Sequence, residues 1–209
     1  MKQSLLLIAI TSAAIPLSFI HAPYPEELVL QHVGTLLGLA CLTCFVLFAR
    51  VSQGSVWCII LFLWLHIIGA RWIYSFVPYD EWARSVTGAS LSDRFGWQRN
   101  HYDRLVHLAS GLLFVPPASE LLQRFGGMRP LVGAIMGIAC VMAIGAFYEI
   151  IEWQIAMLFS PAHAEAYNGQ QGDVWDPQKD MALAAIGAVI SAGIVFRWEP
   201  HDIEPPPSR

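Results

Sequence analysis

Two titratable residues four positions apart stand in the segment Asn100-His-Tyr-Asp-Arg-Leu-Val-His107. Asp103 and His107 share one face of a helix, because residues i and i+4 lie about one turn apart. A carboxylate and an imidazole placed in this way can bind a metal ion, or the carboxylate can hold the histidine in one tautomer. A structural role would account for Asp103 alone, since Asn100 is a good N-cap and an acid in the first turn complements the helix dipole. That role does not explain His107, which lies one turn deeper.

A second pair, Glu149 and Glu152, lies in the segment Tyr148-Glu-Ile-Ile-Glu-Trp153. A spacing of three puts both carboxylates on one helix face. Two carboxylates this close repel each other, so one must be protonated or a cation must lie between them. Glu152 alone could be an ordinary residue at a membrane surface, whereas Glu149 lies deeper in an apolar run and is more costly to bury.

A third acidic group spans Gly172-Asp-Val-Trp-Asp-Pro-Gln-Lys-Asp180. Asp176 followed by Pro177 is typical of an N-cap and the first helical residue, so structure alone could explain Asp176. Asp180 lies one turn inside the expected helix and is the better functional candidate. The preceding loop, 168–173, contains glycines and is by itself a weak signal for phosphate binding.

Basic residues near these acids could bind an anionic substrate. We expect Arg71, Arg99 and Arg104, together with Asp173, to form this substrate-binding part of the site. The same arginines could instead hold the acids in a structural lock, and Arg71 could extend to the membrane surface.

The composition indicates which elements position these residues. The chain has 209 residues, of which 56% are hydrophobic and 13% charged, whereas soluble domains carry about 25% charged residues. No basic run of the kind that binds nucleic acid occurs, and the four cysteines lie in apolar runs that suggest packing rather than disulfides. The composition therefore predicts a membrane protein with no nucleic-acid partner.

About 20 apolar residues are needed to cross a bilayer as a helix. Six segments approach this length: 5–20, 28–48, 56–76, 102–122, 131–158 and 181–196. We therefore predict an all-α fold, a six-helix transmembrane bundle forming a single domain over 1–198, with a disordered tail at 199–209. The segment 5–20 could also be a cleavable signal peptide, but Ile20 is a poor residue at a cleavage site, so a retained span is favoured. Ser90 and Asp93 suggest a short interfacial helix.

The distribution of lysine and arginine favours both termini in the cytoplasm of a bacterial inner membrane, by six residues to five. With six spans, the fourth begins, the fifth ends and the sixth begins on the same side. The three acidic groups should therefore meet at one level, near the outer face. This convergence would survive inversion of the whole protein.

The motifs Arg99–His107, Tyr148–Trp153 and Gly169–Met181 resemble the YjdF-type inner-membrane protein family, over about residues 60–195. The resemblance implies the fold and the location but names no substrate. In that family a histidine and then a glutamate often stand at the outer end of the third span, where this chain has Arg71 and Phe76. A looser similarity links Asp103, His107, Glu149 and Asp180 to the order of acids and histidine in VanZ-like membrane proteins.

Three functions fit these patterns. The first is a metalloprotein, in which Asp103, His107, Glu149, Glu152 and Asp180 bind a divalent ion that acts on a lipid or phosphate-containing substrate. Mixed carboxylate and imidazole ligands suit zinc, manganese or iron. The second is a non-catalytic protein that binds a lipid head group or an unidentified protein partner, with the acids as a structural lock. The third is a proton- or ion-coupled transporter, since buried acids and histidine can relay protons.

Overall fold

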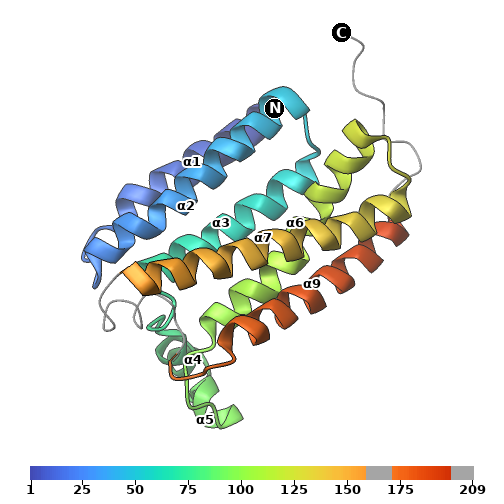
Figure 1. The fold of residues 1–209 in the computed structure, drawn as a ribbon. Coiled ribbons are helices and arrows are strands. Elements are labelled where there is room, and N and C mark those ends of the chain that lie inside the picture. The colour runs from blue at the N-terminus through green and yellow to red at the C-terminus, as the bar shows by residue number, and fades with distance from the viewer. Residues whose placement is uncertain (159–170, 199–209) are drawn as a thin grey trace.

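A computed structural model describes residues 1–158 and 171–198, which fold into helices and connecting turns without a strand (Figure 1). The predicted all-α class is confirmed for this part of the chain. The predicted tail, 199–209, lies outside the described residues. The helices are α1 (Lys2–Ser18), α2 (Pro25–Cys44) with a π-helical extension (Phe45–Ala49), α3 (Gln53–Arg71), α4 (Tyr79–Thr87), α5 (Leu91–Phe95), α6 (Tyr102–Gly126), α7 (Pro130–Leu158) and α9 (Asp176–Trp198).

Five helical segments among the described residues are long and apolar enough to cross a membrane. They are Pro25–Ala49, Gln53–Arg71, Tyr102–Gly126, Pro130–Ile155 and Asp176–Phe196. They correspond to the second to sixth predicted spans. The first predicted span forms α1, which is apolar but only 17 residues long, so helix length alone does not confirm a count of six.

Three small polar residues attach α1 to the bundle. Ser4, Thr11 and Ser18 recur every second turn along α1 and are buried. Ser4 Oγ donates a hydrogen bond to Gln53 Oε1 at 3.0 Å, and Trp64 Nε1 donates one to Thr11 Oγ1 at 3.1 Å. Because Gln53 begins α3 and Trp64 lies in its second half, α1 runs parallel to α3 along most of that helix.

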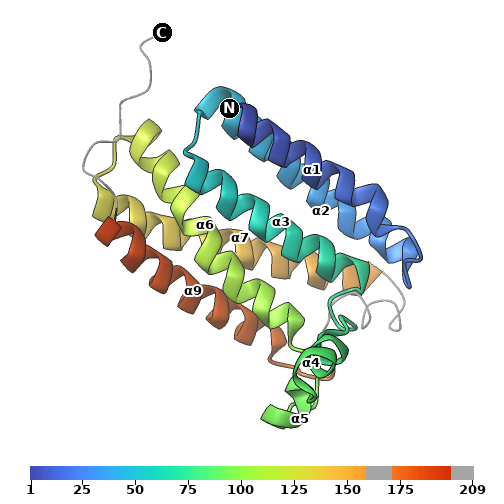
Figure 2. The same ribbon diagram turned by 180° about the vertical axis from the view of Figure 1, so that it is seen from behind.

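The other long helices form a layered bundle. In two opposite views α6 lies between α3 and α9, α7 packs against both α6 and α9, and α1 and α2 lie on the far side of α3 (Figures 1 and 2). The starts of α6 and α9 and the end of α7 lie at the end of the bundle that carries α4 and α5. This arrangement brings the three acidic sequence groups to one end of the molecule.

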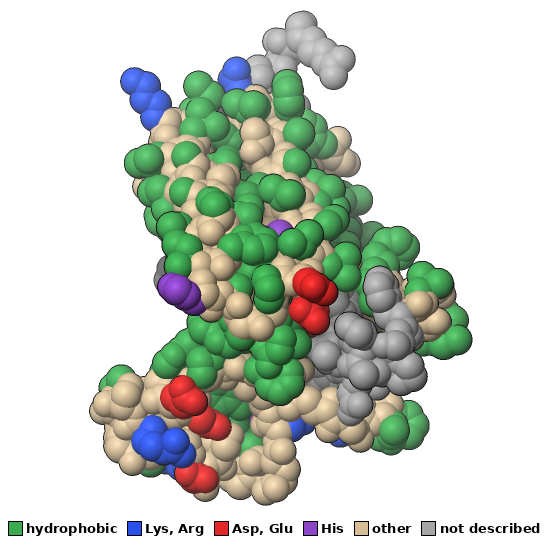
Figure 3. All heavy atoms as spheres, turned by 90° about the vertical axis from the view of Figure 1, so that its left-hand side faces the viewer, with side chains coloured by type: hydrophobic (Ala, Val, Ile, Leu, Met, Phe, Trp, Pro, Cys, Tyr) green, Lys and Arg blue, Asp and Glu red, His purple; other side chains and the backbone are tan. Residues whose placement is uncertain are grey.

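The short helices α4 and α5 form a polar attachment to this end. Asp93 N donates to Ser90 Oγ at 3.0 Å, which confirms the predicted cap of a short helix, and Ser92 N donates to Asp80 Oδ1 at 2.9 Å. The sequence analysis missed α4 itself. On the face drawn in Figure 3, hydrophobic side chains cover most of the bundle, whereas acidic and basic side chains gather on the part at the α4–α5 end.

Two glycines allow α6 and α9 to pack with their backbones in contact. A Cβ atom added to Gly111 would overlap the carbonyl oxygen of Ala184, and one added to Gly187 would overlap that of Leu108. Small residues are the usual means of close helix approach in membranes. Ser191 Oγ adds a hydrogen bond across the same interface, to the carbonyl of Leu112 at 2.8 Å.

Proline does not interrupt this interface. The sequence suggests that Pro116 and Pro117 kink or break the fourth span, but α6 continues through both residues to Gly126. The prolines lie beyond the site, toward the opposite end of the helix.

We predict that Gly111→Ala lowers the free energy of unfolding by about 1–3 kcal/mol, since the added methyl group forces two backbones apart. Gly193→Ala is the matched control, because Gly193 lies in α9, the helix that packs against Gly111, and a Cβ there meets nothing within 4 Å. We expect the control to be as stable as the parent or more stable, by up to about 1 kcal/mol, because alanine favours helix. Thermal unfolding in detergent measures both, and equal melting temperatures for the two variants would contradict the proposed close packing.

Candidate functional site

The first two turns of α6 and the first turn of α9 bring three potential ligands together. Asp103, His107 and Asp180 each offer one ligand atom, and these atoms all lie within 4.8 Å of one another. Asp103 and His107 face the same side of α6, as their spacing predicts, with 3.8 Å between Oδ1 and Nε2. Asp180 is 2% exposed. The predicted convergence of the fourth and sixth spans is therefore confirmed.

The end of α7 adds a third side of the site. Glu149 Oε1 lies 3.6 Å from His107 Nε2. The ring of Tyr148 meets the His107 ring edge to face, with 6.2 Å between their centroids. Glu149 Oε1 and Asp180 Oδ1 are both buried, and neither has a hydrogen-bond partner in the described part of the chain. Buried carboxylate oxygens without partners are costly, so each of these two groups must either be protonated or lie beside a cation.

The distances suit a shared ion better than direct hydrogen bonds. At 3.6 and 3.8 Å, the contacts of His107 with Glu149 and Asp103 exceed the usual hydrogen-bond length of about 2.7–3.2 Å. Two ligands bound at about 2.0–2.2 Å to one ion lie roughly 3–4.4 Å apart. The Asp103, His107 and Asp180 group could therefore hold a metal ion with small adjustments of the side chains.

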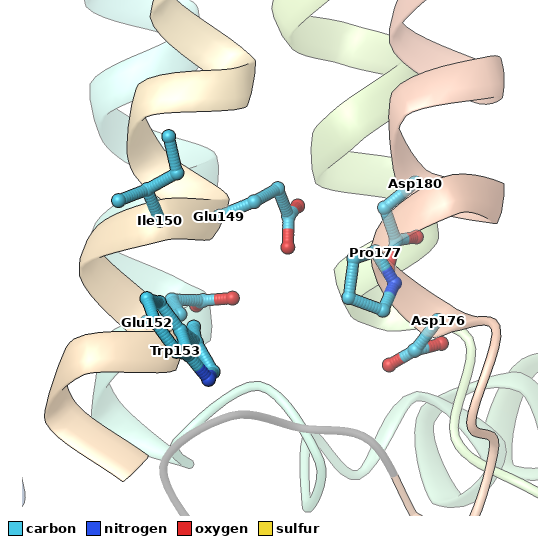
Figure 4. A pocket seen from close by; sticks show the side chains of 7 residues that line it. All are labelled: Glu149, Ile150, Glu152, Trp153, Asp176, Pro177 and Asp180. Atoms are coloured by element: carbon cyan, nitrogen blue, oxygen red, sulfur yellow. The ribbon is translucent and has the colours of Figure 1, made fainter. Parts of the chain in front are cut away.

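A cavity of about 270 Å³ lies beside these groups, between α7 and α9. Figure 4 shows Glu149 and Glu152 extending from α7 toward α9, where Asp180 and Asp176 lie. The lining residues are Glu149, Ile150, Glu152, Trp153, Asp176, Pro177 and Asp180. Glu152 thus shares the cavity with Glu149 and Asp180 but is not one of the three residues that lie closest together.

Two arginines pair with a different set of acids. The guanidinium of Arg99 forms a bidentate contact with Asp176, with Nη2 3.1 Å from Oδ2. Arg104 Nη2 donates to Asp173 Oδ2 at 2.6 Å and to Asp176 Oδ1 at 3.2 Å. Asp176 is 2% exposed, so its carboxylate is the buried centre of this pairing. The sequence analysis assigned Asp176 to a capping role and missed this contact, because nothing local in the sequence links Asp176 to residues far upstream.

Asp173 forms the more exposed part of this ionic cluster. The hydrogen bond from Lys179 Nζ, at 2.6 Å, together with those from the backbone N–H of Trp175 and from Arg104, lowers the pKa of Asp173 to about 2. An unfolded aspartate has a pKa of about 3.9. The stabilisation is therefore fully present above about pH 4 and is lost as the pH falls through about 2. At neutral pH Asp173 is ionised.

Gln171 joins the loop before α9 to the loop before α6. Asn100 N donates to Gln171 Oε1 at 2.8 Å, and Gln171 Nε2 donates back to the carbonyl oxygen of Asn100 at 3.1 Å. Asn100 Oδ1 accepts from Tyr102 N at 3.0 Å, so Asn100 satisfies a first-turn donor of α6, although His101 is the cap residue. Residues 168–170 of the predicted glycine-bearing loop, 168–173, lie outside the described residues. The sequence analysis did not anticipate a role for Gln171.

Arg71 is not brought to the acids, contrary to its predicted place among the substrate-binding residues. Its guanidinium donates to the carbonyl oxygens of Ser18, Ile20 and His21, the latter two at 2.8 and 3.3 Å. The Ser18 carbonyl is the last of α1 and the other two lie in the turn that follows, so none of the three has a partner within the helix. Arg71 therefore stabilises the end of α1, on the side of α3 that faces away from the site.

Two other polar residues have structural partners. His66 Nδ1 contacts the hydroxyl of Tyr74, and its Nε2 lies 3.2 Å from the carbonyl oxygen of Gln31, so this histidine packs against polar neighbours. Glu120, at the opposite end of α6, accepts from Ser52 N at 2.7 Å and lies too far away to join the site.

We predict that Asp176→Asn lowers the free energy of unfolding by about 3–5 kcal/mol, because it leaves the partly buried guanidinium of Arg99 without its carboxylate. Asp173→Asn is the matched control. Asp173 contacts the same arginines but is more exposed, so Asp173→Asn should lower the free energy of unfolding clearly less than Asp176→Asn does. Urea or thermal unfolding of both variants in the same detergent checks the order, and an Asp173→Asn variant that is the less stable of the two would contradict it.

Sequence comparison agrees with this architecture. Residues 3–201 match the family described as "Predicted membrane protein (DUF2238)". The chain is 33% identical over 133 residues to the inner membrane protein YjdF of Escherichia coli (strain K12), a match that covers 63% of this chain and 59% of YjdF. No solved structure matches the chain. Because the family match extends over nearly the whole sequence, the chain belongs to the DUF2238 family of membrane proteins.

Proposed function

We propose that this protein binds a divalent metal ion between α6, α7 and α9, with Asp103, His107, Glu149 and Asp180 as ligands. The proposal rests on two buried carboxylate oxygens beside an imidazole, Glu149 Oε1 and Asp180 Oδ1, which have no hydrogen-bond partner among the described residues. A cation at this position would satisfy both oxygens at once. It would also remove the repulsion between acids at membrane depth.

The division of charges favours a metal over a purely structural lock. A lock would pair the acids with the nearby arginines. Arg99 and Arg104 instead pair with Asp173 and Asp176. Among the described residues, Asp103, Glu149 and Asp180 form no ion pair with lysine or arginine, and His107 is the basic group beside them. A structural lock therefore accounts for the neighbouring cluster of Arg99, Arg104, Asp173 and Asp176. Asp103, Glu149 and Asp180 remain available to an ion.

The ligand set suits zinc, manganese or iron, because these ions accept mixed imidazole and carboxylate ligation. Such an ion could activate a bound water for attack on a phosphate or an ester. Glu152 lines the same cavity and could complete the coordination or accept a proton from that water. We propose that Arg99 and Arg104 contribute to the binding of an anionic substrate, with Asp173 holding their guanidinium groups in place.

The membrane arrangement is the second part of the proposal. Since α1 is bonded along α3, which is itself a candidate span, we propose that α1 is a sixth crossing of a bacterial inner membrane. Both termini would then lie in the cytoplasm, and the site would lie near the outer face with membrane lipid as its partner. A fluorescent protein that folds only in the cytoplasm should fluoresce when it is fused after Arg209. Absence of fluorescence from a well-expressed fusion would show that the C-terminus lies on the other side of the membrane.

Metal content tests the proposal. We expect the full chain, purified without chelator, to contain close to one zinc, manganese or iron per protein, and Asp180→Asn to lose at least about 90% of it, because losing one ligand of a buried site weakens binding strongly. Glu120→Gln is the control, a buried carboxylate at the other end of α6 that should leave the metal in place. Elemental analysis gives the stoichiometry.

Equal metal in parent and Asp180→Asn would contradict the proposed ligands. Absence of metal from all three proteins, even after incubation with each ion, would identify the acids as a proton-sharing network.

A further inference from the structure

The cavity between α7 and α9 reaches the surface that faces the membrane. Ile150 and Trp153 line it, and these side chains are 53% and 57% exposed. Ile150 and Trp153 both belong to the candidate span Pro130–Ile155, so their exposed faces meet lipid rather than bulk water. Tryptophan is common at the level of the lipid head groups. The side of the cavity formed by α7 therefore opens toward the bilayer at that level.

The inner wall of the same cavity is polar. Glu149, Glu152 and Asp180 line it, and Figure 4 shows Glu149 and Glu152 directed across the space toward α9. A molecule that contacts both walls must have an apolar part beside Ile150 and Trp153 and a polar part at the carboxylates. An amphipathic lipid has these two parts in the required order.

The size of the cavity limits which part of a lipid enters it. Pockets for drug-sized ligands measure about 300–1,000 Å³, so about 270 Å³ is enough for a small head group but not for acyl chains. The chains would remain in the bilayer along α7. A ligand arriving from water would have no need of the two exposed apolar residues that line the cavity.

The charges around the cavity indicate which kind of head group it would bind. The three carboxylates alone would repel an anion, whereas a divalent cation bound among them would offset two of their charges and could accept a phosphate oxygen as a further ligand. The guanidinium of Arg104 lies 3.2 Å from Asp176, one of the residues that line the cavity. Resting on the proposed metal site, we propose that the cavity admits the phosphate head group of a membrane lipid sideways, between α7 and α9, so that the phosphate meets the metal while the acyl chains stay in the membrane.

Two neighbouring isoleucines test the lateral route. Ile150 lines the cavity, whereas Ile151 is exposed on the same helix and does not line it. We expect Ile150→Trp to fill the cavity and raise the apparent Kd for phosphatidic acid about tenfold or more, and Ile151→Trp to change it by less than about twofold. Native mass spectrometry of the zinc-loaded full chain, titrated with phosphatidic acid, gives these constants. Trp153→Ala, which removes apolar surface without adding volume, should weaken binding severalfold.

The outcomes separate the two proposals. Equal lipid affinity in Ile150→Trp and Ile151→Trp, with metal content unchanged, would overturn the lateral route and leave the metal site standing. Glycerol 3-phosphate binding as tightly as phosphatidic acid would also overturn it, since the ligand would then come from water. Lipid binding that depends on Ile150 in a protein without metal would support the cavity and refute the metal site.

Discussion

The backbone contact between α6 and α9 is the constraint on which the rest of the site depends. Gly111 and Gly187 remove the side chains that would separate these helices, so the first turns of both helices meet closely enough for His107 and Asp180 to share one space. Helix α7 then closes the third side with Glu149. A hydrophobic contact of ordinary width would keep the ligand atoms too far apart for one ion, because side chains of aspartate and histidine reach only a few ångströms. The packing of small residues in the apolar part of the bundle is thus the cause of the chemistry at its end.

Electrostatics then divides the acids into two groups with different roles. Asp173 and Asp176 pair with two arginines and one lysine, and this cluster joins the start of α6 to the start of α9. Asp103, Glu149 and Asp180 lie beside it around one imidazole, with two carboxylate oxygens that no hydrogen bond satisfies within the described part of the chain. Burying such groups without compensation is unfavourable by several kcal/mol at order of magnitude. We propose that a bound cation compensates these acids at membrane depth, and the adjoining cavity would give that cation access to a ligand.

Much of this arrangement could be predicted from the sequence, because its signals are local. Long apolar runs define the spans, the spacing of Asp103 and His107 defines a helix face, and alternation of direction from span to span brings their helix ends to one side. Contacts between distant residues could not be predicted in the same way. Asp176 has the local features of a helix cap, yet its carboxylate is bound by Arg99 and Arg104. Arg71 was expected near the acids from the predicted topology, but it bonds to the carbonyls at the end of α1. Side-chain direction around a helix depends on which neighbour packs against it, and one sequence does not contain that information.

The most direct test of the central claim is whether His107 binds the metal ion. The protein should be loaded with Mn²⁺ and studied by electron spin-echo envelope modulation, which detects nitrogen bound to manganese. We predict modulation from one imidazole nitrogen, which changes on labelling histidine with ¹⁵N, persists in His66→Gln and is absent from His107→Gln. Bound Mn²⁺ without nitrogen modulation, or modulation that persists in His107→Gln, would contradict a metal site built by α6, α7 and α9.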